Sequence, residues 1–194
     1  MDRQELQRAL CNYHTLYPEE SAYARRGCAL LQLVPDCFLR TSPGLHLTAS
    51  TWVLNPAGDR TLFLHHRKLD QWFQPGGHCD GDEDVLRVAL RECSEETGLP
   101  QSAIQILSSR IFDIDIHRIP ARRHEDEHQH LDIRFLVGID DQLPLAGNTE
   151  SYELRWILLS EVHRYNHELS IHRMLVKSQL WLRQQQRARN PFQP

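Results

Sequence analysis

Residues 77–99, GHCDGDEDVLRVALRECSEETGL, constrain this chain more than any other stretch. Asp82 is a suitable N-cap residue, and residues 85–96 contain neither glycine nor proline, so the sequence predicts a helix that begins after Asp82. Gly98 supplies a left-handed cap at its end. One side of the helix is expected to pack on the protein interior, because about 100° per residue brings together Leu86, Ala89, Leu90 and Cys93.

Three carboxylates, Glu92, Glu95 and Glu96, lie beside this apolar side. Positions three and four apart are neighbours on a helix, and like charges placed there destabilise an isolated helix. A divalent cation would offset the repulsion. A solvated acidic face is the alternative, but these carboxylates border the packed side rather than lying opposite it. The preceding Gly76 and Gly77 would also let the backbone come close to a bound group.

The same stretch resembles the signature of the Nudix hydrolases: Gly, five residues, Glu, seven residues, then Arg-Glu-apolar-x-Glu-Glu-x-Gly-apolar. Every fixed position is filled, with a cysteine at the aliphatic position: Gly77, Glu83, Arg91, Glu92, Cys93, Glu95, Glu96, Gly98 and Leu99. The resemblance implies an α/β fold, a Nudix-type α/β/α sandwich with a mixed sheet, in which the signature packs as loop–helix–loop. It also implies hydrolysis of a nucleoside diphosphate linked to another group, with Mg²⁺ or possible Mn²⁺ as the cofactor.

On this resemblance, the catalytic residues are expected to be Glu92, Glu95, Glu96 and Arg91, with the three glutamates as metal ligands. The general base stays open between Glu92 and an acidic residue of the 121–130 loop. The candidates in that loop are Glu125, Asp126 and Glu127.

Structural support is expected from Glu83, as the ion-pair partner of Arg91, and from Gly98. Gly76 and Gly77 are assigned to substrate binding, because they would hold the loop in a shape that side chains obstruct.

Further substrate-binding candidates lie outside the signature. Arg67 follows a predicted strand, where it could meet phosphates, and Trp72 could stack on a base or simply pack in the core. His128, His130 and Asp132 would share one face of an extended chain. That face is either a set of metal or substrate ligands, with His130 the substrate-binding candidate, or a solvated strand edge.

The chain of 194 residues suits one domain with a modest extension. We expect a helical extension over residues 1–40 and the signature-bearing domain over 41–194. The extension would comprise helices over residues 2–16 and from residue 18, whose role is packing, covering the substrate pocket or forming a homodimer contact. Strands are expected over residues 46–54, 61–66, 104–107, 111–117, 131–137 and 154–159, and helices over 160–168 and 170–186.

Composition limits the classes of binding partner and the cellular location that we expect. The net charge of −4 gives no sign of a general nucleic-acid surface, so the expected partner is a small nucleotide-type substrate rather than stable nucleic acid. No apolar run suits a membrane span, and the first residues do not resemble a signal peptide. The odd number and scattered positions of the cysteines favour reduced thiols and a cytoplasmic location: Cys11, Cys28, Cys37, Cys79 and Cys93.

Three functions remain open on the sequence alone. The leading one is a hydrolase of a nucleotide sugar, an ADP-ribose-like molecule or a nucleoside triphosphate. The others are a catalytically weak Nudix-type nucleotide sensor and an RNA 5′-end pyrophosphohydrolase. The signature does not discriminate among substrates, because base and linked group would be recognised by loops outside it.

Overall fold

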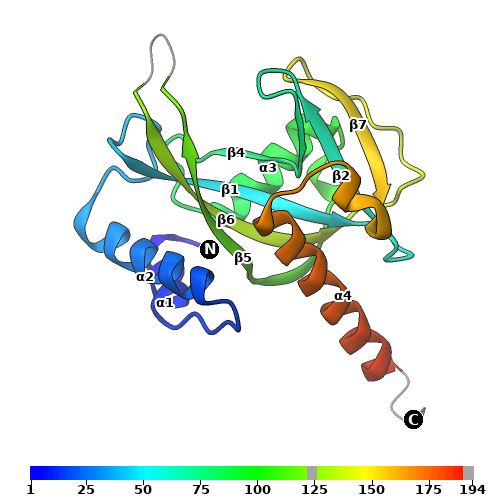
Figure 1. Ribbon diagram of the computed structural model, residues 1–194, viewed down its shortest axis with the longest axis horizontal. Coiled ribbons are helices and arrows are strands. Elements are labelled where there is room, and N and C mark those ends of the chain that lie inside the picture. The colour runs from blue at the N-terminus through cyan, green and yellow to red at the C-terminus, as the bar shows by residue number, and fades with distance from the viewer. Residues whose placement is uncertain (122–125, 190–194) are drawn as a thin grey trace.

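A mixed sheet of seven strands lies at the centre of the molecule (Figure 1). The structure, a computed structural model, describes residues 1–121 and 126–189. The strand order is β3–β2–β1–β6–β5, with β4 also paired to β1 and β7 to β2. The strands are β1 (Leu45–Leu54), β2 (Arg60–His66), β3 (Gln71–Phe73), β4 (Gly76–His78), β5 (Gln105–Ile119), β6 (His128–Gly138) and β7 (Ser151–Leu158).

The parallel pairing of β1 with β6 makes the sheet mixed, since all its other pairings are antiparallel. Its register places His46 opposite His130 and Thr48 opposite Asp132. Side chains alternate between the two faces of a strand, so the polar residues of β1 and β6 share one face. The opposite face is apolar and carries Leu47, Ala49, Leu131, Ile133 and Phe135.

Three helices cover this apolar face: α1 (Arg3–Cys11), α2 (Pro18–Leu33) and α3 (Val85–Thr97). Leu6 and Leu10 of α1 and Val88 of α3 are fully or almost fully buried in a single core with the strands. Burying one such side chain contributes about 1.5–3 kcal/mol to folding. The first two helices therefore share a core with the signature helix, and the division at residue 40 stays a proposal.

The other face is covered by α4 (Leu169–Arg189) and the 3-10 helix η2 (Leu159–Arg164), whose apolar residues surround Trp52 of β1. Figure 1 shows α4 in front of the sheet and α3 behind it. This arrangement confirms the predicted α/β/α sandwich with a helical N-terminal segment.

Several local expectations are wrong. The strands expected over residues 104–107 and 111–117 form the single strand β5, and the helix expected over residues 2–16 ends at Cys11. The helix over residues 160–168 is instead the 3-10 helix η2. Asp84 rather than Asp82 caps α3, where it accepts a hydrogen bond from the Arg87 backbone N–H at 3.0 Å. Asp82 binds the Arg87 guanidinium from outside the helix. Aspartate suits either role, and the identity of the cap depends on where the preceding turn ends.

The expectation of reduced thiols is wrong for two cysteines. Cys11 of α1 and Cys28 of α2 form a disulfide, whereas Cys37, Cys79 and Cys93 are free and buried. With this disulfide, the cysteines no longer favour a cytoplasmic location. Among the helices of the described residues, none has both the length and the apolar character of a membrane span.

Candidate active site

Glycines in β4, before α3, and at the C-terminal end of α3 allow close approaches between chain segments around the signature helix. Gly98 has a φ of 72°, and a Cβ there would lie 2.6 Å from Cβ of Ala146. Gly76 lies against β1, where a Cβ would be 2.8 Å from the carbonyl oxygen of Ala49. Contacts shorter than 3 Å are not tolerated by real Cβ atoms, so the close approach of these segments requires glycine.

Glu96 is buried between α3 and the glycine turn, with 5% of its surface exposed. The Gly76 backbone N–H donates a hydrogen bond to Glu96 Oε2 at 2.8 Å. Burial above all, together with the negative charges of Glu92, Glu150 and Glu95, raises the pKa of Glu96 to about 8, although the hydrogen bond from Gly76 acts in the opposite direction. An ionised carboxylate in this position is stabilised by a cation at the same site.

Glu92 lies one helical turn earlier and is half-buried, and a side chain on Gly77 would overlap its carboxylate. Burial raises the pKa of Glu92, while Arg91 acts in the opposite direction. The Arg91 guanidinium donates to Glu92 Oε1 at 2.7 Å and to the His78 carbonyl oxygen at 2.9 Å. Arg91 therefore ties the helix to β4 directly beside the carboxylates.

Glu95 lies at the solvent edge of the same helix, with 60% of its side chain exposed and 3.8 Å from Arg91. The structure thus brings Glu92 and Glu96 against the Gly76–Gly77 backbone, with Glu95 at the rim. The three glutamates thus offer carboxylate oxygens around one backbone turn, two of them buried to different extents and one exposed. Oxygen ligands of this kind suit a hard divalent cation.

The predicted ion pair between Glu83 and Arg91 is wrong. Glu83 instead accepts a hydrogen bond from Arg3 of α1 at 2.9 Å, and Arg91 pairs with Glu92. Arg3 lies far from Glu83 in sequence, so spacing could not have indicated this pair. Glu83 therefore connects the signature loop to the first helix.

Arg67 and Trp72 lie on the side of the sheet formed by β2, β3 and β7. Arg67 Nε donates to the Ser151 carbonyl oxygen at 2.8 Å. Trp72 stacks on His65 with 4.9 Å between ring centroids and carries the Arg155 guanidinium 5.1 Å above its ring. Both side chains thus have structural partners of their own, and their roles in substrate binding stay predictions.

Asp132 is buried and hydrogen-bonded within the polar face of the sheet. Its carboxylate accepts from Thr48 Oγ1 at 3.1 Å, from Ser50 Oγ at 2.8 Å and from Arg134 Nε at 2.8 Å. His130 lies two residues earlier on the same face of β6, where its neighbours are other histidines. Burial and the neighbouring imidazoles lower the pKa of His130 to about 2.

Histidines from four strands surround His130: His46 of β1, His78 of β4, His117 of β5 and His128 of β6 itself. His46 lies in the strand expected over residues 46–54 and His78 in the five-residue spacer of the signature, and neither was predicted to be a metal ligand. The pairing of β1 with both β6 and β4, which no local pattern contains, brings His46, His78 and His130 together. Of the acidic loop candidates, Asp126 and Glu127 are exposed, and Glu125 lies outside the described residues.

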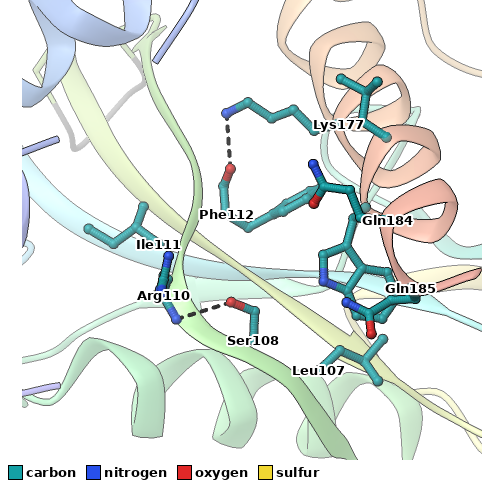
Figure 2. A pocket seen from close by; sticks show the side chains of 10 residues that line it. Leu107, Ser108, Arg110, Ile111, Phe112, Lys177, Gln184 and Gln185 are labelled. Carbon is teal, nitrogen blue, oxygen red and sulfur yellow. Dashed lines mark hydrogen bonds between the residues drawn. The ribbon is translucent and has the colours of Figure 1, made fainter. Parts of the chain in front are cut away.

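A pocket of about 430 Å³ lies between β5 and α4 (Figure 2). Its lining includes Phe112, Trp181 and Lys177, whose ammonium donates to the Phe112 carbonyl oxygen at 2.9 Å. Within the described parts of the chain, the pocket is lined by none of the residues predicted for the active site. The chemistry of the carboxylates therefore places the candidate site at α3 rather than at this pocket.

Known proteins resemble both the sequence and the fold. The NUDIX domain model matches residues 44–177. A probable DHNTP pyrophosphohydrolase of Lactococcus lactis subsp. cremoris is 30% identical over 62% of this chain and 67% of its own length. An RNA pyrophosphohydrolase of Acidiphilium cryptum is 36% identical over 47% of this chain and 60% of its own length.

The fold is also that of a C. elegans Ap4A hydrolase in a binary complex. Its TM-score is 0.59 at 19% identity, over 70% of this chain and 96% of that chain. The family match and the hydrolase relatives support an enzyme that acts on pyrophosphate bonds. The matched domain includes the whole signature and the carboxylates of α3, and the chain therefore belongs to the Nudix family.

Proposed function

We propose that this protein hydrolyses a small nucleoside diphosphate derivative, with Mg²⁺ or Mn²⁺ held by Glu92, Glu95 and Glu96. The observation that carries the proposal is the packing of Glu92 and Glu96 against the Gly77 and Gly76 backbone. Burying carboxylates is costly unless they are neutralised or bound to a cation, and this cost is offset when a divalent ion binds.

The donor set fits such an ion. All three side chains offer oxygen, the ligand that Mg²⁺ and Mn²⁺ prefer, and the helix α3 is anchored on the sheet beneath them. When bound, the ion would neutralise phosphate oxygens and lower the pKa of a coordinated water.

In the proposed mechanism, Glu92 or an acidic residue of the 121–130 loop accepts the proton of the attacking water. That water attacks phosphorus, and the anhydride bond to the leaving phosphate breaks. Arg91 keeps Glu92 in position through the hydrogen bond described above. Gly76 donates its N–H to Glu96 and so fixes the deepest ligand.

The substitution Glu96→Gln tests the ligand assignment. It removes a charge while preserving the side-chain size, so we expect kcat to fall by roughly 10²–10⁴-fold with little change in the unfolding temperature. Steady-state kinetics with Mg²⁺ measures the first and thermal unfolding the second. Glu168→Gln, an exposed glutamate before α4, is the matched control and should keep full activity. Near-normal turnover of the Glu96 variant would refute the assignment.

Measuring turnover against a panel of candidate substrates would identify the substrate class. This panel should contain dihydroneopterin triphosphate, dinucleoside polyphosphates, nucleotide sugars, ADP-ribose and deoxynucleoside triphosphates, each with Mg²⁺ and with Mn²⁺. We propose a small molecule because the net charge of −4 does not favour long nucleic acid. The panel also includes 5′-triphosphate RNA, since one relative is named for that activity.

A nucleotide sensor is the alternative that the carboxylates disfavour, because a binding module has no need of a complete set of metal ligands. Substrate binding by Arg67, Trp72 and His130 is part of our proposal. So are structural support by Glu83 and Gly98, the domain boundary at residue 40 and a homodimer.

A further inference from the structure

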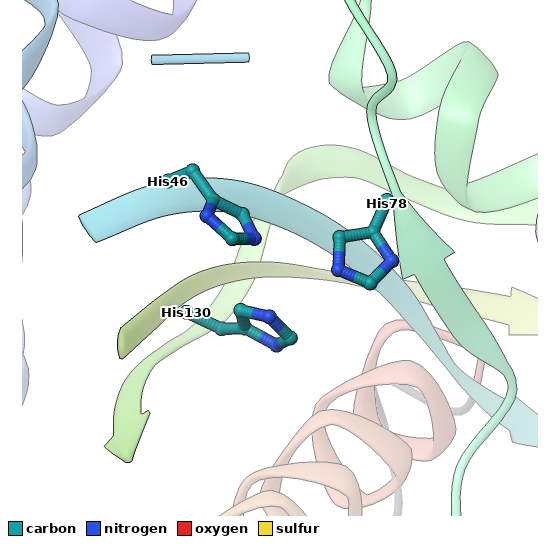
Figure 3. Close-up of side chains that lie close together, drawn as sticks. All are labelled: His46, His78 and His130. Carbon is teal, nitrogen blue, oxygen red and sulfur yellow. The ribbon is translucent and has the colours of Figure 1, made fainter. Parts of the chain in front are cut away.

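Three imidazole rings from three different strands converge at one end of the sheet. They belong to His46 of β1, His78 of β4 and His130 of β6 (Figure 3). One ring nitrogen of each lies within 4.8 Å of those of the other two. His46 is buried, and His78 and His130 are half-buried.

Main-chain pairing produces this arrangement. His46 and His130 are register partners in the parallel pair β1–β6, and His78 is the partner of Thr48 in the antiparallel pair β1–β4. Neighbouring strands lie about 4.8 Å apart, so side chains from these positions on one face must meet. The sheet therefore brings the three residues close together on one face.

The distances suit a metal ion after small side-chain rotations. The ring centroids are 4.7 Å apart for His46 and His130, 4.9 Å for His78 and His130, and 5.3 Å for His46 and His78. A zinc ion binds each imidazole nitrogen at about 2.0–2.1 Å, which places tetrahedral ligand atoms about 3.3 Å apart. The ring nitrogens, now within 4.8 Å of one another, would have to approach to that value when an ion binds.

His128 supplies a fourth imidazole beside the three. Its Nδ1 lies 2.8 Å from the carbonyl oxygen of Asp126, and because a carbonyl only accepts, Nδ1 carries the proton. In the neutral ring its Nε2 is then unprotonated, and this atom lies 3.2 Å from His130 Nε2. A bond from one ring nitrogen to a backbone carbonyl is the usual way in which a metal-binding histidine is oriented.

The donor atoms determine the class of ion. Imidazole nitrogen suits Zn²⁺, Cu²⁺, Ni²⁺ and Fe²⁺, whereas Mg²⁺ and Ca²⁺ prefer oxygen. The next acidic residue along β6, Asp132, is occupied by Thr48, Ser50 and Arg134. We propose that His46, His78 and His130 form a binding site for a borderline transition-metal ion, Zn²⁺ above all, separate from the carboxylates of α3.

The position of His78 gives such an ion a consequence. His78 directly follows Gly77, and its carbonyl oxygen accepts the hydrogen bond from Arg91. An ion shared by His46, His78 and His130 would cross-link β4 to β1 and β6. It would thereby fix the glycine turn beside the carboxylates, without itself contacting the reacting phosphates.

Zinc binding to the whole chain, purified without a polyhistidine tag and freed of metal by a chelator, tests the proposal. We expect one Zn²⁺ per chain in competition with a chromogenic chelator, unaffected by millimolar Mg²⁺. Co²⁺ in its place should give the intense visible absorption of a low-coordinate, nitrogen-rich site. Zinc should also raise the unfolding temperature, because it binds the folded chain.

Variants assign the ligands. His78→Ala and His130→Ala should each weaken zinc binding by about 100-fold or more, whereas His172→Ala, at an exposed position of α4, should not. Glu95→Gln should keep the zinc site even if it loses Mg²⁺-dependent turnover, which separates this proposal from the hydrolase proposal.

Three results would overturn the zinc site. The first is undiminished zinc binding in both folded histidine variants. The second is loss of zinc in Glu95→Gln but not in those variants. The third is that calorimetry detects no zinc binding but does detect inorganic phosphate binding at the same histidines. Circular dichroism checks folding, and the zinc-dependent rise in the wild-type unfolding temperature supplies a test that needs no variant.

Discussion

Two adjacent glycines control how closely the carboxylates of α3 approach the sheet. Gly76 faces Ser50 and Ala49 of β1, while Gly77 faces the carboxylate of Glu92. Neither glycine has a positive φ, so close approach rather than backbone freedom requires them. An alanine at either position would meet atoms of a neighbouring segment, but only at Gly77 are those atoms part of the proposed catalytic machinery.

Gly77→Ala is therefore expected to lower kcat by about 100-fold, because the added methyl group displaces the Glu92 carboxylate while the flexible glutamate absorbs the strain. Michaelis–Menten kinetics and thermal unfolding together measure this. Gly138→Ala is the control, since a Cβ there meets Leu107 at 3.4 Å or more, an ordinary contact. Equal activity of the two variants would contradict the steric argument.

At the scale of the elements, a buried charge network joins β5, β6 and α4. Arg134 of β6 lies 3.3 Å from Asp113 and from Asp115 of β5, and Arg173 of α4 lies 2.8 Å from Asp113. Although desolvation acts against ionisation, the hydrogen bond with His117 and the charge of Arg134 lower the pKa of Asp115 to about 2. These strands and the helix are thus coupled through ionised groups.

This coupling predicts a specific acid sensitivity. The folded-state pKa of Asp115 lies below its ordinary 3.8, so the unfolded chain takes up its proton first as the pH falls. The ionised carboxylate contributes about 2 kcal/mol, which is fully present above about pH 4 and is lost as the pH falls through about 2.

Denaturant unfolding across this pH range measures the effect. The difference in unfolding free energy between the wild type and Asp115→Asn should shrink below pH 4, because only the wild type loses a charge there. Asp36→Asn, at an exposed position, should follow the wild type throughout. A constant difference between the wild type and Asp115→Asn would show that the carboxylate does not titrate as the geometry requires.

Elements with a strong local pattern could be predicted from the sequence. The 3.6-residue period and Gly98 indicated α3, and the alternation of polar and apolar residues indicated β1 and β6. The site was predictable as far as the signature extends. Two contacts could not be predicted from the sequence: the ion pair of Arg3 with Glu83 and the approach of His46 to His130. Each depends on how separate elements pack together. The sequence also does not show whether Asp82 or Asp84 caps α3, because that depends on the geometry of the turn before the helix.

At the scale of the whole molecule, the N-terminal helices complete the core instead of standing apart from it. Gly27 of α2 allows this, because a Cβ there would lie 2.9 Å from side-chain atoms of Leu10 and Leu131. The disulfide between Cys11 and Cys28 links the end of α1 to the middle of α2. A sequence with scattered cysteines does not reveal this pairing, because helix packing brings the two together.

The disulfide is expected to stabilise the folded chain by about 3 kcal/mol, since it closes a loop between residues 17 positions apart and so restricts the unfolded state. Replacing both cysteines by alanine should lower the unfolding free energy in urea by that amount under non-reducing conditions. Adding a reductant should lower the stability of the wild type to that of the variant and leave the variant unchanged. The carboxylates of α3 are not part of this linkage, so the variant should keep its kcat below its unfolding temperature. If the variant is as stable as the oxidised wild type, the disulfide contributes nothing measurable. In that case the packing of buried side chains such as Leu6 and Leu10 alone holds α1 against α2.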